Sequence, residues 1–179
     1  MDHPHRELIL NYIDVLGFDK PIVSVFEVGC NAGPNLLKIQ KTLPQIRLGG
    51  CDVNPDAIAL AKEKLPDAEL FEASASKLPV PDKSYDVVLI DAVCLYFNPR
   101  QIIIVLNEMQ RVAKRGLILV EWKDKSTYGV VKDFHWARNY KRLLENMGYR
   151  VEETKLRESD WPSKNWSKHG YVYLAEAKG

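Results

Sequence analysis

The sequence predicts an α/β fold built on a mainly parallel sheet. Short runs rich in β-branched and aromatic residues alternate with longer runs of helical periodicity along the chain. The run at residues 85–90 is apolar almost throughout, as in a central strand that helices cover on both faces. No repeat or linker interrupts the alternation, and 179 residues suit one domain with a full core. We therefore expect a single domain over residues 1–179.

Glycine, proline and capping residues place the boundaries of the expected elements. Gly17 ends the first helix, and Asn54 is placed to cap the third. The expected helices are 6–16, one from about 34, one from 54 or 55 to near 66, 99–113 and 134–146. The expected strands are 23–28, 47–53, 70–73, 85–90, 117–120, 149–156 and 171–175. The apolar stripe of the 99–113 helix is predicted to comprise Ile103, Leu106, Met109 and Val112.

Composition and charge exclude several classes of protein. Lys plus Arg number 25 and Asp plus Glu 24, and no basic cluster stands out, which argues against a nucleic-acid partner. No window is apolar enough for a membrane helix, and the N-terminus does not have the form of a signal peptide. Cys30, Cys51 and Cys94 have no metal-ligand spacing and lie in apolar runs, so we expect buried free thiols and no metal. We expect a cytoplasmic protein without a membrane partner.

The segment FEVGCNAGPNL, residues 26–36, lies where the first strand passes into a helix. In open parallel sheets this junction borders the crevice that binds ligands. Gly29 and Gly33 permit backbone torsions that other residues resist, and Asn31 tolerates a positive φ. A dinucleotide fingerprint would require glycine at positions 31 and 34, where this chain has Asn31 and Pro34.

Two carboxylates indicate the charge and the sugar of the ligand. Glu27 lies at the mouth of the loop, where it would repel a pyrophosphate and favour a cation. Asp52 ends the second strand about twenty positions beyond the glycines, the distance at which an acidic residue accepts ribose hydroxyls. Together they predict a cationic ligand that carries a ribose and no phosphate.

With these motifs in order, the chain resembles the short single-domain class I S-adenosylmethionine-dependent methyltransferases, of the type 11-like group. EVGCNAG is similar to the family's first motif and CDVNPDAIALAK to its second. ASASKLPVPDKSYDVVLIDAV and LNEMQRVAKRGLILVE are similar to the stretches that follow. The resemblance implies a Rossmann-like three-layer sandwich. Its sheet would have seven strands, mainly parallel, with the last strand antiparallel.

The resemblance also implies which residues bind S-adenosyl-L-methionine. The methionine portion would contact the first loop, the ribose Asp52 and the adenine Val53, with Ser74 and Ala75 at the adenine edge. Many relatives have aspartate where this chain has Ser74, which weakens the expected contact to the adenine amine. The expected cofactor-binding residues are Glu27, Gly29, Asn31, Gly33, Asp52, Val53, Ser74, Ala75 and Asp91.

The chemistry of methyl transfer requires alignment more than a base, and a base helps only when the acceptor must lose a proton. Asp91 follows the central strand near the expected methyl position, and it and His135 are the candidate catalytic residues. His3 and His5 are expected in a loose terminus. We expect Tyr96, Trp122 and Trp136 to line the acceptor pocket, with residues 1–20 as an N-terminal helix and 122–170 as the substrate-side or lid region.

The leading hypothesis is a methyltransferase that acts on a small-molecule acceptor. The segment after Asp91 lacks the Pro-Pro form used for planar amines, and no proline precedes Cys94, so nucleobase methylation is disfavoured. Two alternatives stay open. One is a non-catalytic module that binds the cofactor or supports a partner, and the other is a protein or RNA methyltransferase that relies on a partner chain. The acceptor, the atom methylated and the oligomeric state do not follow from the sequence.

Overall fold

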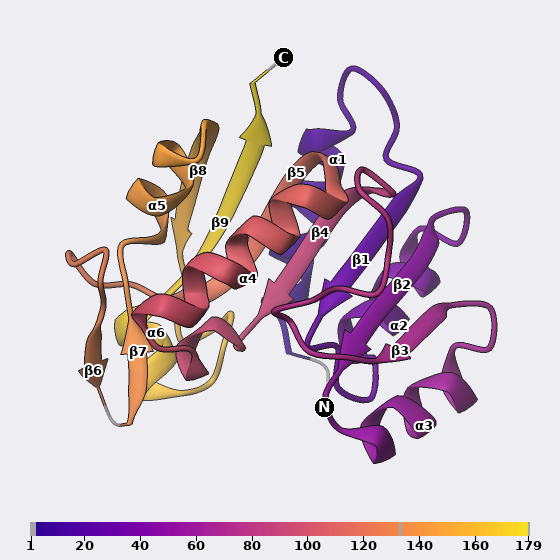
Figure 1. The fold of residues 1–179 in the computed structure, drawn as a ribbon, viewed down its shortest axis with the longest axis horizontal. Coiled ribbons are helices and arrows are strands. Elements are labelled where there is room, and N and C mark those ends of the chain that lie inside the picture. The colour runs from indigo at the N-terminus through magenta and orange to yellow at the C-terminus, as the bar shows by residue number, and fades with distance from the viewer. Residues whose placement is uncertain (1–2, 133, 179) are drawn as a thin grey trace.

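The computed structural model describes residues 3–132 and 134–178, which form a seven-stranded sheet and flanking helices (Figure 1). The strand order is β3-β2-β1-β4-β5-β9-β8. Only β9 runs against its neighbours, so the expected mainly parallel sheet with an antiparallel last strand is confirmed. The strands are β1 (Ser24–Val28), β2 (Arg47–Asp52), β3 (Glu69–Glu72), β4 (Tyr85–Asp91), β5 (Ala113–Trp122), β8 (Tyr149–Lys155) and β9 (Gly170–Ala177).

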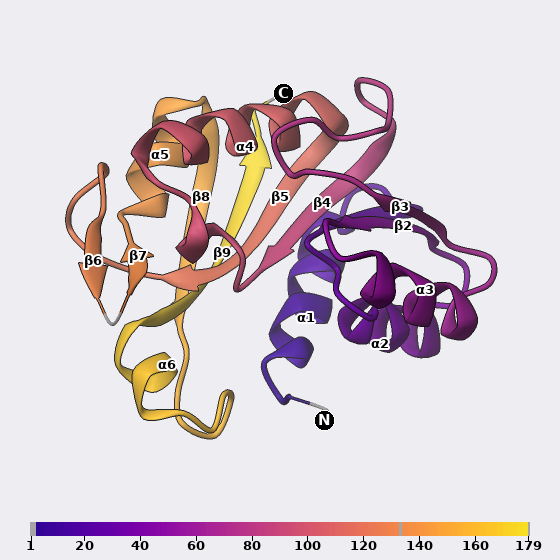
Figure 2. The same cartoon turned by 60° about the horizontal axis from the view of Figure 1, so that its bottom comes forward.

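Helices cover both faces of the sheet, so the molecule has three layers with the sheet in the middle (Figure 2). Helices α1, α2 and α3 lie on one face, and α4 and α5 lie on the other. A two-stranded hairpin, β6 (Val130–Lys132) and β7 (His135–Ala137), projects beside α5. The helices are α1 (Arg6–Leu16), α2 (Pro34–Thr42), α3 (Pro55–Lys64), α4 (Pro99–Val112), α5 (Tyr140–Asn146) and α6 (Lys164–His169), with a 3-10 turn η1 (Cys94–Tyr96).

The core divides at the sheet because alternate residues of a strand point to opposite faces. In β4, Val87 and Leu89 pack in the cluster that holds α1, α2 and α3, whereas Val88 and Ile90 pack under α4 and α5. All four side chains are fully buried. The apolar run of this strand therefore has the cause inferred from the sequence, which is burial on both faces.

Two expectations about the helices are wrong. The helix expected over residues 134–146 begins only at Tyr140, because His135–Ala137 pairs with Val130–Lys132 as strand β7 and Asn139 caps α5. In α4 the buried stripe includes Ile102 and Val105, whereas Ile103 is half exposed. The N-terminal boundary set by Pro99 is right, and Leu106, Met109 and Val112 are buried as expected, so the predicted stripe is wrong only at Ile103.

The three cysteines are free and buried, as the sequence predicts. Within the described ranges, no helix combines the length and apolarity needed to cross a membrane.

Candidate active site

A cavity of about 590 Å³ opens at the carboxyl ends of β1, β2, β3 and β4. The chain proceeds outward from β1 through β2 and β3, then returns to place β4 on the other side of β1. This reversal leaves a crevice between β1 and β4, the position at which open α/β sheets bind ligands. The loops after all four strands line the cavity, and the N-terminal residues and Trp161 complete its wall.

The loop after β1 takes its shape from three residues with positive φ. Gly29 has φ 71°, Asn31 49° and Gly33 74°, so the tolerance expected of Asn31 is used. A Cβ on Gly29 would lie 2.5 Å from the side chain of Val93, which faces it across the crevice. Gly33 lies outside the cavity wall and packs toward Leu65, at the C-terminal end of α3. Gly29 therefore allows the close approach of two loops, while Gly33 starts α2.

Asp52 lies at the end of β2 and lines the cavity. Its Oδ2 accepts from the backbone N–H of Asn31 at 2.9 Å, and its Oδ1 accepts from that of Asn54 at 2.9 Å. An ionised carboxylate has about four acceptor positions, so each oxygen can accept one more donor. Asp52 thus fixes the first loop and still offers acceptors to a ligand.

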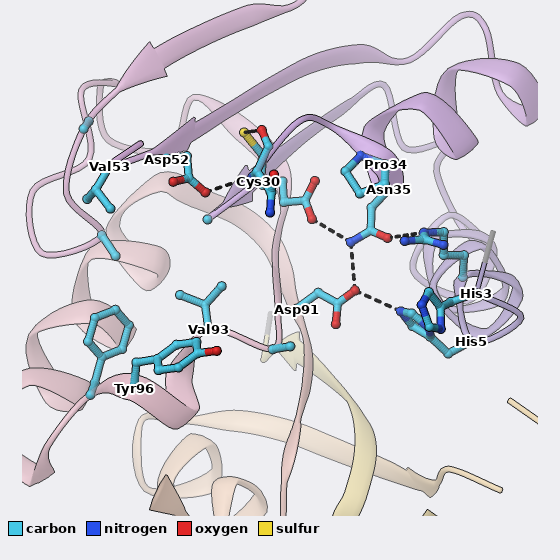
Figure 3. A pocket seen from close by; sticks show the side chains of 18 of the residues that line it. His3, His5, Cys30, Pro34, Asn35, Asp52, Val53, Asp91, Val93 and Tyr96 are labelled. Atoms are coloured by element: carbon cyan, nitrogen blue, oxygen red, sulfur yellow. Dashed lines mark hydrogen bonds and ion pairs between the residues drawn. The ribbon is translucent and has the colours of Figure 1, made fainter. Parts of the chain in front are cut away.

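The end of the cavity beside Asp52 presents the apolar side chain of Val53 (Figure 3), and Ala73, Ser74 and Ala75 belong to the same wall. Val53 is 70% exposed although it is apolar, and Ala75 is buried against the cavity. Ser74 Oγ lies 2.8 Å from Ser76 Oγ and accepts from the Ser76 N–H. A flat ring bound against Val53 would cover this apolar surface, with the Ser74 hydroxyl at its edge.

At the opposite end, one amide joins two carboxylates (Figure 3). Asn35 Nδ2, on α2, donates to Glu27 Oε1 at 2.6 Å and to Asp91 Oδ2 at 2.8 Å. The Asn35 Oδ1 accepts from Arg6 Nε at 2.7 Å. Asp91 Oδ2 also lies 2.9 Å from His5 Nε2. These five side chains form a buried network that links β1, β4, α2 and the N-terminal segment.

The second oxygen of each carboxylate, Glu27 Oε2 and Asp91 Oδ1, is buried and has no hydrogen-bond partner among the described residues. Burial is the main cause that raises the pKa of Glu27 well above its usual range, and the nearby Asp91 adds to it. Two carboxyls with free oxygens in a shielded site suit a cationic ligand that donates hydrogen bonds. The acceptor oxygens of Glu27 and Asp91 therefore fit an ammonium group, and the Asp52 end fits a ribose.

A family model described as "Methyltransferase domain" matches residues 25–116, just over half of the chain. The chain belongs to the methyltransferase domain family. The cofactor of this family is S-adenosylmethionine, so the resemblance seen in the motifs is confirmed.

The curated relatives of this chain are distant and longer. The ubiquinone/menaquinone biosynthesis C-methyltransferase UbiE of Campylobacter jejuni is 26% identical over 76% of this chain and 60% of its own length. The trans-aconitate 2-methyltransferase of Escherichia coli is 24% identical over 65% of this chain and 46% of its own. The chain thus spans about half to three fifths of these relatives.

Solved methyltransferase structures share the fold. Magnesium protoporphyrin IX methyltransferase from Synechocystis PCC 6803, with bound SAM, has a TM-score of 0.69 at 15% identity, covering 98% of this chain and 80% of its own. The plantazolicin methyltransferase BpumL, in complex with an analogue and SAH, has a TM-score of 0.70 at 18% identity over 97% and 83%. The Rossmann-like fold is confirmed by this likeness.

The aromatic residues that the sequence places on the acceptor side separate into two groups. Tyr96 lines the cavity and is 67% exposed. His135 lies behind it, with ring centroids 5.3 Å from both Tyr96 and the buried Trp122. The Arg138 guanidinium lies over the ring of Trp136, 5.1 Å from its centroid. His135, Trp122 and Trp136 are thus outside the residues that line the cavity.

The expectation of a loose terminus for His3 and His5 is wrong. Both line the cavity, and His5 is 1% exposed. The backbone N–H of His5 donates to the Asp160 carbonyl at 2.8 Å, and its ring stacks on Trp161. These contacts join residues more than 150 positions apart, so no local pattern in the sequence predicts them. Asn35, whose partners Glu27, Arg6 and Asp91 lie 8, 29 and 56 positions away, was also missed from the sequence, although its place one residue after Pro34 put it beside the first loop.

Two buried ionisable side chains hold the loop that follows β4. Glu121, fully buried at the end of β5, accepts from the N–H groups of Val93 and Cys94 at 2.9 and 2.6 Å. Arg138, also fully buried, donates to the carbonyl oxygens of Cys94 and Phe97. Burial raises the pKa of Glu121 to about 8. The position of Tyr96 therefore depends on residues of β5 and of the segment after β7.

Proposed function

We propose that this protein transfers the methyl group of S-adenosylmethionine to a small-molecule acceptor. The observation that carries the proposal is a cavity with two carboxylates, Glu27 and Asp91, at one end and the carboxylate of Asp52 at the other. Its volume of about 590 Å³ is typical of pockets that hold one or two small ligands. One curated relative is named for ubiquinone and menaquinone biosynthesis and another for trans-aconitate, which is a small molecule.

The cofactor would lie along the cavity from Asp91 to Val53. Glu27 and Asp91 would accept from its ammonium group, and Asp52 would accept from both ribose hydroxyls. The adenine would cover Val53 and meet Ala75, with Ser74 at its edge. Gly29 and Asn31 would let the first loop follow the methionine portion, and Gly33 would act indirectly by starting α2.

The acceptor would enter from the side of Tyr96 and Trp161, both of which line the cavity. Tyr96 is exposed toward solvent, and Trp161 stacks on Trp166 with ring centroids 3.9 Å apart. We therefore assign part of the 122–170 region to the acceptor side. Trp122, Trp136 and His135 would support this wall from behind rather than touch the acceptor.

Catalysis in this arrangement rests mainly on alignment. The bound cofactor supplies an activated methyl group on its sulfonium. The carboxylates at the methionine end fix one end of the cofactor and Asp52 fixes the other, so the reacting carbon is held in place. The aromatic wall excludes water and positions the acceptor. A base is needed only for acceptors that lose a proton.

Asp52→Ala tests the cofactor site. Removing the carboxylate leaves the ribose hydroxyls unpaired, which weakens binding by about 1–3 kcal/mol. Calorimetry with S-adenosylmethionine measures the change in dissociation constant. Asp56→Ala is the matched control, because Asp56 is an exposed carboxylate on the first turn of α3 outside the cavity wall. Equal affinities of the Asp52 variant and the wild type would defeat the ribose assignment.

A screen of small-molecule pools with isotopically labelled cofactor tests the activity itself. We expect label in one class of small acceptor. Cofactor binding without transfer to any pool would favour a non-catalytic module. Label that enters only protein or RNA from a lysate would instead show an enzyme of the other class, and either result would overturn the small-molecule proposal.

A further inference from the structure

His5 is a buried imidazole inside the cavity and directly beside a carboxylate. Its Nε2 lies 2.9 Å from Asp91 Oδ2, and the His5 residue is 1% exposed (Figure 3). The segment that carries it is fixed by the backbone bond from the His5 N–H to the Asp160 carbonyl. The ring is also stacked on Trp161, with centroids 4.3 Å apart and planes at 19°. His5 is therefore held in one orientation from three sides.

The partner of Nε2 determines which ring nitrogen carries the proton. An ionised carboxylate can only accept, and Asp91 Oδ2 also accepts from Asn35 Nδ2. Nε2 must then donate, so in the neutral ring Nδ1 has a free lone pair. Nδ1 is buried and has no hydrogen-bond partner in residues 3–132 and 134–178. A basic nitrogen without a partner thus belongs to a residue that lines the cavity.

Charged and titratable groups surround this ring from every element packed against it. Asp91 comes from the end of β4, and Glu27 reaches the network from β1 through Asn35. The N-terminal segment contributes Arg6, and His3 with its centroid 5.8 Å from that of His5. On the remaining side, the carboxylate of Asp160 is bound by Arg157. Among residues 3–132 and 134–178, Asp91 is the carboxylate that contacts the His5 ring.

We propose that His5 is the general base of this enzyme and that Asp91 orients it, for an acceptor whose hydroxyl must lose its proton. The inference rests on the proposed function. The hydroxyl proton passes to His5 Nδ1 while the oxygen lone pair forms the bond to the methyl carbon. The bond between methyl and sulfur breaks, and its electron pair stays on sulfur. The products are a methyl ether, S-adenosylhomocysteine and a protonated His5.

The acceptor class follows from the wall around His5. Trp161 and Tyr96 present aromatic surface to the cavity, which suits a planar apolar body. A phenol or an enol combines such a planar body with a hydroxyl whose proton a histidine can accept. His135, the other candidate base, lies behind Tyr96 and does not line the cavity.

The first test needs no acceptor. Long-range proton–nitrogen NMR of the protein saturated with S-adenosylhomocysteine reports which nitrogen of His5 is protonated. We expect the Nε2–H form with a bare Nδ1 at high pH, and loss of this preference in Asp91→Ala. His5→Gln assigns the signal. An Nδ1–H form, or a ring that stays doubly protonated from pH 5 to 9, would overturn the proposal.

The second test uses the pH profile of transfer to phenolic and enolic acceptors. His5→Gln keeps an amide that can donate to Asp91 but has no basic nitrogen. We expect kcat to fall about 10²–10⁴-fold, with loss of the rising limb of the pH profile. The dissociation constant for S-adenosylmethionine should change less than about threefold. The His135→Gln variant should retain the rising limb.

The outcomes separate the inference from the function on which it rests. Transfer with an unchanged pH profile in His5→Gln would show an active enzyme whose base is not His5. Loss of the rising limb in His135→Gln alone would move the base to His135. If no acceptor is methylated, the function fails, while the NMR measurement still decides the state of Nδ1.

Discussion

The fold strongly alters the chemistry of Glu27. Its side chain lies in the middle of a parallel sheet, and the pKa of the carboxyl is raised chiefly by burial. One amide, from Asn35, satisfies one of its oxygens, while the other has no partner in the described chain. A carboxyl in this state favours the neutral form until a cation arrives. Glu27 therefore couples ligand charge to proton binding.

We expect the affinity for S-adenosylmethionine to rise with pH because of Glu27. The free protein holds the proton at a raised pKa, and the cofactor ammonium lowers that pKa, so binding releases a proton. Linkage then strengthens binding as pH increases toward the pKa of the free protein, by at most about tenfold per pH unit for one group. Calorimetry between about pH 5 and 7, where the ammonium stays charged, in two buffers of different ionisation enthalpy measures both effects.

Glu27→Gln is the control for this coupling, since glutamine keeps the oxygen that accepts from Asn35. The variant should bind more weakly and with a smaller dependence on pH. Proton release that is the same in variant and wild type would assign the effect to another group.

At the scale of elements, the loop after β4 is held by neighbours that lie far away in the sequence. Glu121 joins the end of β5 to the backbone of Val93 and Cys94, and Arg138 joins the segment after β7 to Cys94 and Phe97. Both side chains are fully buried. Since Val93 also packs against Gly29 of the first loop, the two walls of the crevice are fixed together.

Glu121→Gln is expected to flatten part of the pH dependence of stability in the cofactor-free protein. The folded protein raises the Glu121 pKa from 4.5 to about 8, so it binds more protons than the unfolded chain in that interval. The stability due to Glu121 is then complete below the unfolded pKa and is lost as pH rises through the folded one. Glutamine keeps the acceptor for both N–H groups but does not ionise.

Urea denaturation at a series of pH values measures this difference. The free energy of unfolding of the wild type should fall relative to that of the variant, by at most about 1.4 kcal/mol per pH unit. Parallel curves for the two proteins between pH 4.5 and 8 would contradict the assignment of that titration to Glu121.

The elements that local chemistry determines could be predicted from the sequence. The first loop is set by Gly29, Asn31 and Gly33, and each takes a positive φ, which glycine and asparagine tolerate better than other residues. Asn54 caps α3 through its side chain, as its position indicated. The burial of β4 could be predicted from its apolar composition alone. In each case the cause lies within a few residues, so a single sequence suffices.

The elements that depend on distant contacts could not be predicted. The segment around His135 has residues acceptable to a helix, but pairing with β6 and the burial of Arg138 favour a strand and a turn. His5 becomes part of the cavity only because Asp91 and Trp161 are brought to it by the fold. Such contacts override local preference and leave no periodic signal in the sequence.

At the scale of the whole molecule, one cavity joins the N-terminal segment, the loops after four strands and the turn before α6. In this arrangement a ligand contacts elements from both halves of the chain at once. Its binding energy should therefore stabilise the global fold rather than one loop, because the unfolded chain has no such site.

We expect S-adenosylmethionine to raise the melting temperature, by an amount that grows with the logarithm of the ratio of its free concentration to the dissociation constant. At a free concentration of 100 times the dissociation constant, a ligand that binds only the folded state adds about 2.7 kcal/mol. For a chain of this size, each kcal/mol shifts the midpoint by about 2–4 °C, so we expect a rise of about 5–11 °C. Differential scanning calorimetry at several concentrations measures the shift.

Asp52→Ala at the same cofactor concentration should show a smaller shift, which recovers when the concentration is raised in proportion to the new dissociation constant. Asp56→Ala should shift as the wild type does. A cofactor that saturates the protein in titration yet leaves the midpoint unchanged would mean that the unfolded chain binds it equally well. That result would contradict a site built by the convergence of four strand ends, because such a site exists only when the sheet is formed.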